Sequence, residues 1–178
     1  TGTSANGCTG TDVVMVTINT PAISAGSNVT ICSGSCTPLF ASGGVTYVWS
    51  PSTGLSCISC PNPTACPPGS TTYTVTGTDA NGCTNMAFVT VTISAFPTIT
   101  ITGNSFVCIG FCTALTASGG TTYSWSTGAT TASITICPTA PTSYTVVGAN
   151  AIGCTNTNSV SVSVSGVITP NILTTTFA

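Results

Sequence analysis

The chain contains the same segment twice, and this internal repeat limits the folds that are open to it. Residues 42–50 (SGGVTYVWS) return as residues 118–126 (SGGTTYSWS). The match continues downstream, where residues 72–75 and 82–85 return as 143–146 and 153–156. The period is about 71 to 75 residues, close to the smallest size at which a β domain folds alone. Two complete units of one small domain are therefore expected.

A third, partial copy opens the chain. Residues 5–9 (ANGCT) align with residues 80–84, and Val14, Val16 and Ile18 align with Val89, Val91 and Ile93. The predicted organisation follows from these matches. Residues 1–20 are the C-terminal hairpin of a preceding repeat, and residues 21–94 and 95–165 are complete repeats. Residues 166–178 are the first strand of a following repeat or a strand-exchange tail.

Each repeat shows the alternation of apolar and polar residues that is typical of β-strands. In residues 88–93 (FVTVTI), Val89, Val91 and Ile93 share one face, and Asn81-Gly82 favours a tight hairpin turn before them. Aromatic side chains recur at fixed strand positions and are expected in the core: Tyr47, Trp49, Tyr73, Tyr123, Trp125 and Tyr144. About seven short strands per unit, with a Trp in the third, predict an all-β fold of tandem immunoglobulin-like β-sandwiches.

The chain has no Lys, Arg, His, Glu or Gln, and its side-chain carboxylates are Asp12 and Asp79. Acid–base catalysis depends on groups that titrate near the working pH, so we expect neither enzyme activity nor a cofactor. Nucleic acids are unsuitable partners because phosphate binding relies on Lys and Arg. No apolar run reaches the roughly 18 to 20 residues of a transmembrane helix, so we expect no membrane span.

The motifs of residues 47–51 (YVWSP), 54–57 (GLSC), 71–75 (TTYTV) and 79–83 (DANGC) resemble PKD-like or immunoglobulin-like repeats of Bacteroidota secreted and cell-surface proteins. The resemblance covers nearly the whole chain. It implies export by the type IX system and a role as an adhesin, a gliding-associated filament or an accessory module of a secreted enzyme. The uncharged composition departs from the family, whose members usually keep some Lys and Glu.

Eleven cysteines indicate an oxidising compartment and a disulfide framework. The alignment of the repeats equates the cysteines in four pairs: Cys32 with Cys108, Cys36 with Cys112, Cys66 with Cys137 and Cys83 with Cys154. The first and last of these positions flank neighbouring strand ends, so we predict two bridges within each repeat. The predicted bridges are Cys32–Cys83, Cys36–Cys66, Cys108–Cys154 and Cys112–Cys137. Cys57 and Cys60 are expected to pair locally, and Cys8 is expected to have no partner within the chain.

Metal-binding and redox roles are alternatives to a purely structural role for some cysteines and for Asp79. Structural zinc at Cys57, Cys60 and Cys66 would need four N or S ligands, yet the chain has no His, so we expect no metal. A redox role for Cys57 and Cys60 would need a nearby cation or helix N-terminus, and neither is apparent. Asp79 could begin a calcium loop, but a turn fits its single carboxylate better. Calcium, like zinc, is therefore not expected.

Surface chemistry offers two further candidate sites. The aromatic residues at positions 47, 49, 123 and 125 would form a sugar-stacking platform if exposed, although aromatics at one strand position are more often core. Asn28-Val29-Thr30 is an N-glycosylation sequon. An isopeptide cross-link is excluded because it needs Lys.

These observations predict a structural component of an extracellular or cell-surface filament, stalk or fibre. An uncharged, Thr-rich β surface favours association, so the expected partners are copies of the chain or adjoining repeats of a longer chain. We favour a segment of a longer repeat chain over a strand-exchanging subunit. The alternatives are an adhesin or glycan-binding module, with glycans as partners, and a spacer of a secreted enzyme.

Overall fold

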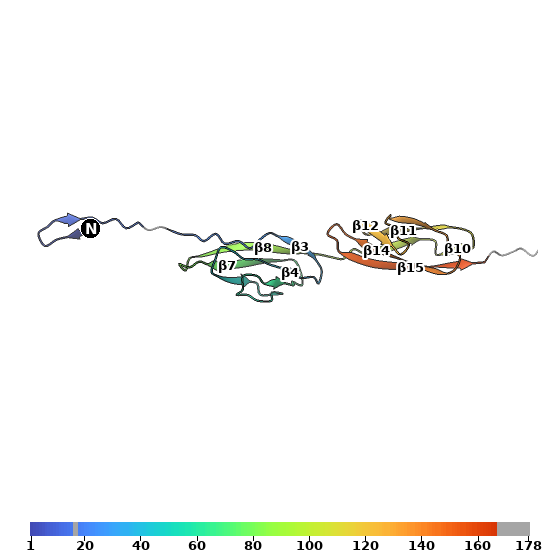
Figure 1. Ribbon diagram of the computed structural model, residues 1–178, viewed down its shortest axis with the longest axis horizontal. Helices are drawn as coiled ribbons and strands as arrows, with labels where there is room; N and C mark the ends of the chain where they lie inside the picture. The colour runs from blue at the N-terminus through green and yellow to red at the C-terminus, as the bar shows by residue number, and fades with distance from the viewer. Residues whose placement is uncertain (16–17, 167–178) are drawn as a thin grey trace, which may run out of the picture. The chain divides into compact units, whose positions relative to one another are not determined.

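The computed structural model describes residues 1–15 and 18–166 of the chain, and β-strands and turns account for all of their regular structure (Figure 1). A short hairpin comes first, formed by β1 (Gly2–Thr3) and β2 (Thr9–Gly10). The strands of residues 21–94 are β3 (Val29–Cys32), β4 (Thr37–Pro38), β5 (Thr46–Ser50), β6 (Thr64–Ala65), β7 (Thr71–Thr78) and β8 (Thr84–Ser94). The strands of residues 95–165 are β9 (Thr100–Gly103), β10 (Phe106–Cys108), β11 (Thr113–Ser118), β12 (Thr122–Trp125), β13 (Ser133–Ile136), β14 (Thr142–Ala149) and β15 (Thr155–Ser165).

The second complete repeat folds as two packed sheets. One sheet has the strand order β10-β15-β14-β12, and the other has the order β13-β11-β9. Their facing side chains form one core, in which Val146 and Val162 from the first sheet meet Leu115 and Ile134 from the second. The 4 + 3 strand arrangement is the β-sandwich that the alternating pattern predicts.

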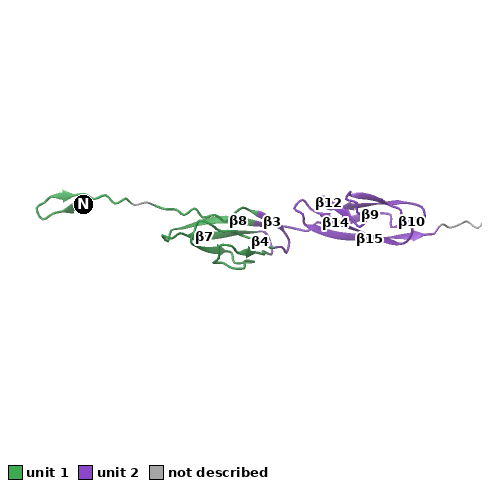
Figure 2. Ribbon diagram, viewed as in Figure 1, with its two compact units in different colours: residues 1–28, 36–67, 71–90 green, residues 29–35, 68–70, 91–178 purple. Residues whose placement is uncertain are grey.

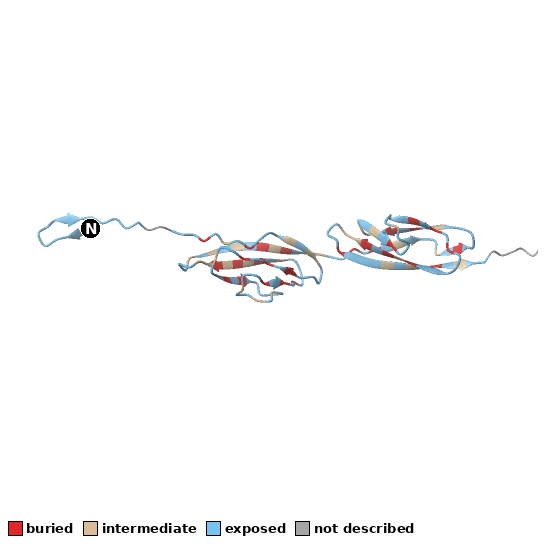
Figure 3. Ribbon diagram, in the orientation of Figure 1, coloured by how far each residue is buried: buried red, intermediate tan, exposed pale blue. Residues whose placement is uncertain are grey.

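The first complete repeat has the corresponding four-stranded sheet, with the order β3-β8-β7-β5, and a second sheet reduced to the pair β4-β6. Isolated bridges between Ser24 and Ser42 and between Leu55 and Ala65 extend the smaller sheet. The burial pattern alternates along the strands, and in β7 the buried positions are Tyr73, Val75 and Gly77 (Figure 3). Alternation with a period of two therefore places the same residue types inward in both repeats.

In each repeat, an early strand that ends in a cysteine runs parallel to the last strand. Val29 to Cys32 of β3 lie opposite Val91 to Ser94 of β8, and Phe106 to Cys108 of β10 lie opposite Ser163 to Ser165 of β15. The cysteine that ends β3 or β10 is consequently placed beside the last residue of an eleven-residue strand. This register decides which cysteines can meet.

Gly77 and Gly148 occupy equivalent positions where the sheet needs a residue without a side chain. A Cβ atom on Gly77 would overlap the Cδ1 atom of Ile23, and a Cβ on Gly148 would overlap that of Ile99. The isoleucine at the start of each repeat packs directly on the glycine backbone. The glycines thus allow the first residues of each repeat to pack closely against β7 or β14.

Two compact units emerge from the internal contacts, as coloured in Figure 2. Unit 1 contains residues 1–28, 36–67 and 71–90, and unit 2 contains residues 29–35, 68–70 and 91–178. The limits differ from the repeat boundaries predicted from the sequence, since three short segments of residues 21–94, namely 29–35, 68–70 and 91–94, group with unit 2. The predicted residue Val16 and the predicted tail at 167–178 lie outside the described residues. Val13, Val14, Met15 and Ile18 are exposed.

Candidate functional site

A disulfide between Cys32 and Cys154 links the first complete repeat to the second. Cys32 ends β3 and Cys154 directly precedes β15, 122 residues later in the chain. Their Cα atoms are 5.6 Å apart, within the usual range for disulfides. Both residues belong to unit 2, and Cys154 is 1% exposed. The bond is therefore a partly buried cross-link between consecutive repeats.

This pairing corrects two of the predicted bridges, Cys32–Cys83 and Cys108–Cys154, neither of which is formed. Cys32 lies opposite Ser94 at the end of β8, whereas Cys83 precedes the first residue of that strand. At about 3.3 Å per residue, an eleven-residue strand separates its two ends by roughly 33 Å, far beyond the reach of a disulfide. The same geometry applies to Cys108 and Cys154 at opposite ends of β15.

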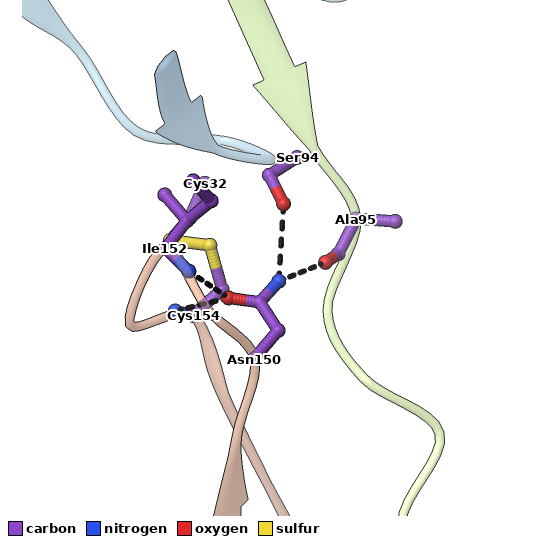
Figure 4. The surroundings of a disulfide bond; sticks show 6 residues. All are labelled: Cys32, Ser94, Ala95, Asn150, Ile152 and Cys154. Atoms are coloured by element: carbon purple, nitrogen blue, oxygen red, sulfur yellow. Dashed lines mark hydrogen bonds between the residues drawn. A yellow bond between two sulfur atoms is a disulfide. The ribbon is translucent and has the colours of Figure 1, made fainter. Parts of the chain in front are cut away.

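Asn150 holds the hairpin that carries Cys154 against the end of β8 (Figure 4). Its Oδ1 atom accepts hydrogen bonds from the backbone N–H groups of Ile152 and Cys154, both at 3.0 Å. Its Nδ2 group donates to Ser94 Oγ at 3.0 Å and to the carbonyl oxygen of Ala95 at 3.1 Å. The Asn150 amide thus stabilises the turn of the hairpin and also holds the hairpin against Ser94, which lies opposite Cys32 in the sheet.

The hairpin that begins at Asp79 makes an equivalent docking contact. Here the side chain of the hairpin accepts the hydrogen bond, whereas Asn150 donates it. Asp79 Oδ1 accepts from the N–H groups of Asn81 at 2.8 Å and Cys83 at 2.9 Å, as Asn150 does in its own turn. Asp79 Oδ2 accepts from Nδ2 of Asn19 at 2.9 Å. Asn19 follows Ile18 in the sequence as Ser94 follows Ile93. Asp79 therefore uses its carboxylate as a turn cap and docking group, and Cys83 stands where Cys154 stands in the next repeat.

The remaining bridges lie within single repeats. Cys36 is bonded to Cys66 and Cys112 to Cys137, with Cα separations of 4.3 Å and 4.2 Å. Cys57 is bonded to Cys60 across a loop. The three cysteines considered as zinc ligands, Cys57, Cys60 and Cys66, are therefore all bonded in disulfides. Cys8 and Cys108 are exposed thiols, and Cys83 is a partly exposed one.

Most of the aromatic side chains considered for sugar stacking are buried. Trp49 is 2% exposed and Trp125 is 3% exposed. Their Nε1–H groups donate to the carbonyl oxygens of Cys60 at 3.0 Å and Thr131 at 2.9 Å. Tyr47, Tyr73 and Tyr144 are also buried, whereas Tyr123 is partly exposed and packs against the core of its repeat. Neither indole ring is available as a platform for a ligand.

Tyr73 is fully enclosed, and its hydroxyl donates to the carbonyl oxygen of Thr53 at 2.7 Å. Burial raises the pKa of the Tyr73 phenol above 10, because the charged phenolate would lose its hydration. The neutral form of Tyr73 is thus part of the folded core.

Asn28, in the glycosylation sequon, is exposed, and its Oδ1 atom accepts from the N–H of Thr90 at 2.8 Å. Within residues 1–15 and 18–166, no three His, Cys, Asp or Glu side chains are grouped as metal ligands. The same residues include no helix of the length and apolarity that a membrane span requires. Glycosylation of Asn28 remains a prediction.

An open pocket of about 280 Å³ lies beside the Cys108 thiol at the end of β10. Phe106, Phe111 and Thr113 line it together with Val107 and Asn104. Phe106 is 70% exposed and Phe111 is 65% exposed. Large phenyl rings that stay in contact with water around a thiol form an apolar patch at this end of the repeat. Sequence reasoning missed this patch, although Phe106, Ile109 and Phe111 replace Thr30, Ser33 and Ser35 of the first repeat.

No protein-family model and no curated protein sequence matches the chain. Solved structures do match. The N-terminal eight Ig domains of Down Syndrome Cell Adhesion Molecule align with 13% identity, 81% coverage of this chain, 24% coverage of that one and a TM-score of 0.56. An I-band fragment of titin aligns with 11% identity, 84% and 67% coverage and a TM-score of 0.51.

A calcium-stabilised adhesin that helps an Antarctic bacterium bind ice aligns with 14% identity. The match covers 94% of this chain and 56% of that one, with a TM-score of 0.55. The chain thus spans only part of the adhesion proteins that it matches, about a quarter of the first and just over half of the second. At these identities the likeness establishes the fold. The chain is a disulfide-stapled tandem of immunoglobulin-like β-sandwiches.

Proposed function

We propose that this protein is a structural component of an extracellular filament, stalk or fibre, in which repeats are cross-linked in series by disulfides. The observation that carries the proposal is the Cys32–Cys154 bond, which joins consecutive repeats. A disulfide within a repeat only stabilises that repeat. A disulfide between repeats adds a second covalent connection along the chain, which is useful in a fibre under tension.

The proposed role depends on where tension would pass through the chain. Residues 33–153 lie between the two bonded cysteines, so tension applied outside them crosses the sulfur–sulfur bond directly. The core of the second repeat lies within this enclosed stretch, apart from Cys154 and Val162. Residues 33–153 would therefore be spared from covalent extension, while β15, which pairs with β14 and β10, would stay in the path of the tension.

The uncharged surface also favours a fibre. With a net charge of −2 and no Lys, Arg or His, copies repel one another weakly. Disulfides persist in oxidising compartments, which supports an extracellular or cell-surface location. We also propose, from the sequence resemblance, that the repeats are PKD-like repeats of a Bacteroidota protein exported by the type IX system. An adhesive or glycan-binding role is the alternative, with the exposed phenyl rings of Phe106 and Phe111 as its contact surface.

Negative-stain electron microscopy and sedimentation velocity of the purified, oxidised chain test the proposal. We expect filaments and a broad distribution of large species, both in buffer and at high salt, because ionic contacts contribute little. A single monomeric species at all protein concentrations, with no fibres on the grids, would contradict the filament role.

A further inference from the structure

We propose that Cys108 of one copy forms a disulfide with Cys8 of a second copy, joining copies head to tail. The proposal rests on the filament function above and names its partner and its bond. The equivalent cysteines are already bonded to each other in this structure, because Cys108 corresponds to Cys32 and Cys8 corresponds to Cys154. The Cys32–Cys154 bond is thus the template for the bond between copies.

The hairpin around Cys8 has the same backbone structure as the hairpin that carries Cys154. Ser4 N–H donates to the Cys8 carbonyl at 2.9 Å, and Gly7 N–H donates to the Ser4 carbonyl at 2.9 Å. The matching bonds, from Asn150 N–H to the Cys154 carbonyl and from Gly153 N–H to the Asn150 carbonyl, are both 3.0 Å long. Each hairpin is preformed.

The side chain at the first position of the hairpin also keeps its role. Ser4 Oγ accepts from Cys8 N–H at 3.2 Å, as Asn150 Oδ1 accepts from Cys154 N–H. The Ser4 hydroxyl retains a proton that it can donate, as Asn150 Nδ2 donates to Ser94 and Ala95. The Cys8 hairpin therefore has a side-chain turn cap and one possible donor where the Cys154 hairpin has Asn150, and its sulfur is exposed.

The receiving end on the second repeat matches the end that holds Cys154. Cys108 pairs with Ser165 in β15 as Cys32 pairs with Ser94 in β8, so its thiol stands in the same place relative to the last strand. Cys108 is exposed, and Phe106, Ile109 and Phe111 surround it with exposed apolar surface. A docked hairpin would cover these side chains and remove them from water. The contact joins two different ends of the chain, so each added copy leaves a free end and the contact can extend a filament.

Bond formation needs an oxidant, and a small-molecule or protein disulfide provides it. The Cys108 thiolate attacks one sulfur of the oxidant, the other sulfur of the oxidant leaves as a thiolate, and a mixed disulfide forms on Cys108. The Cys8 thiolate then attacks the Cys108 sulfur and displaces the second thiolate of the oxidant. Two thiols lose two protons and two electrons, and the oxidant gains both as it becomes two thiols.

Mixing single-cysteine variants tests the inference. The wild-type chain in a glutathione disulfide buffer should give a ladder of oligomers on non-reducing electrophoresis, and reduction should collapse the ladder to monomer. Cys8→Ser and Cys108→Ser should each abolish the ladder, whereas a mixture of the two should stop at the dimer. Cys83→Ser is the matched control and should leave the ladder unchanged.

Mass spectrometry identifies the bond in the wild-type protein even where a variant folds poorly. Trypsin has no Lys or Arg to cleave after, so the digest uses pepsin, whose acidic pH also suppresses disulfide exchange. A peptide pair joining Cys8 and Cys108 supports the inference. A ladder that survives in Cys108→Ser, or a bond from Cys108 to Cys83, overturns it.

Electron microscopy of the same samples separates this inference from the proposed function. Wild-type filaments that carry no cross-link between Cys8 and Cys108 would overturn the bond between copies and leave the filament role intact. Wild-type protein that is neither cross-linked nor filamentous would overturn both.

Discussion

At the residue scale, Asn150 holds the link between repeats in place, since its amide makes four hydrogen bonds and leaves no donor unused. Asn150→Ala should lower the free energy of unfolding by about 2 kcal/mol, because it removes both the turn cap and the docking contact. Urea denaturation of the oxidised protein measures this loss. An unchanged midpoint would argue against the role of Asn150.

A paired substitution separates docking from capping at the same position. Asn150→Asp keeps the acceptor oxygen for the turn but places a carboxylate against the Ser94 hydroxyl and the Ala95 carbonyl, so it should destabilise the protein. Adding Ser94→Asn recreates the pair formed by Asp79 and Asn19 and should restore part of the loss. A double-mutant cycle from thermal unfolding gives the coupling energy, and zero coupling would contradict the proposed equivalence.

Tyr73 should make the fold less stable at alkaline pH. Its pKa in the folded state is raised by burial, so stability is fully present below the ordinary phenol pKa of about 10 and falls as the pH rises above that value. Denaturation midpoints between pH 9 and 12, on protein whose free thiols are alkylated, should show a decline that Tyr73→Phe reduces. Tyr73→Phe should also cost about 1 kcal/mol at neutral pH, because Thr53 loses its donor.

At the scale of the strands, the sequence predicts which residues alternate between the core and the surface, but it does not predict which strands pair. On the predicted face of residues 88–93, Val89 and Val91 are buried and Ile93 is partly buried, and the expected core residue Tyr73 is buried. Such positions can be predicted because a period of two is a local property of the sequence. Parallel pairing of β3 with β8 is not local, and nothing in the alternation reveals it. Alignment of the repeats equates cysteines but leaves open whether they bond within one repeat or with the next.

The staple within the second repeat offers a test at this scale. Cys112 and Cys137 close a loop of 25 residues between β11 and β13, and removing it should cost roughly 3 to 4 kcal/mol in the chain-entropy model. The double variant Cys112→Ser/Cys137→Ser should therefore unfold at a lower denaturant concentration than wild type. A matched variant, Cys57→Ser/Cys60→Ser, removes a bridge between cysteines only three residues apart and should cost much less. Equal losses would contradict the loop-length argument.

At the scale of the whole molecule, the Cys32–Cys154 bond should govern how the chain responds to force. When the chain is stretched from its two ends by atomic force microscopy, the Cys32→Ser variant should reach a greater contour length than the wild-type chain. The separation of 122 residues, less the loops of 30 and 25 residues closed by other bridges, corresponds to about 24 nm at 3.6 Å per residue. Equal contour lengths for the two proteins would contradict the proposed tension path.

The central claim is that a disulfide joins consecutive repeats, and a peptide map of the unreduced protein tests it most directly. After free thiols are blocked in acid and the chain is digested with pepsin, mass spectrometry should find the Cys32 peptide linked to the Cys154 peptide. Cys83 should be recovered as a blocked thiol. Peptides that link Cys32 to Cys83 and Cys108 to Cys154 would contradict the claim, since each repeat would then be stapled only to itself.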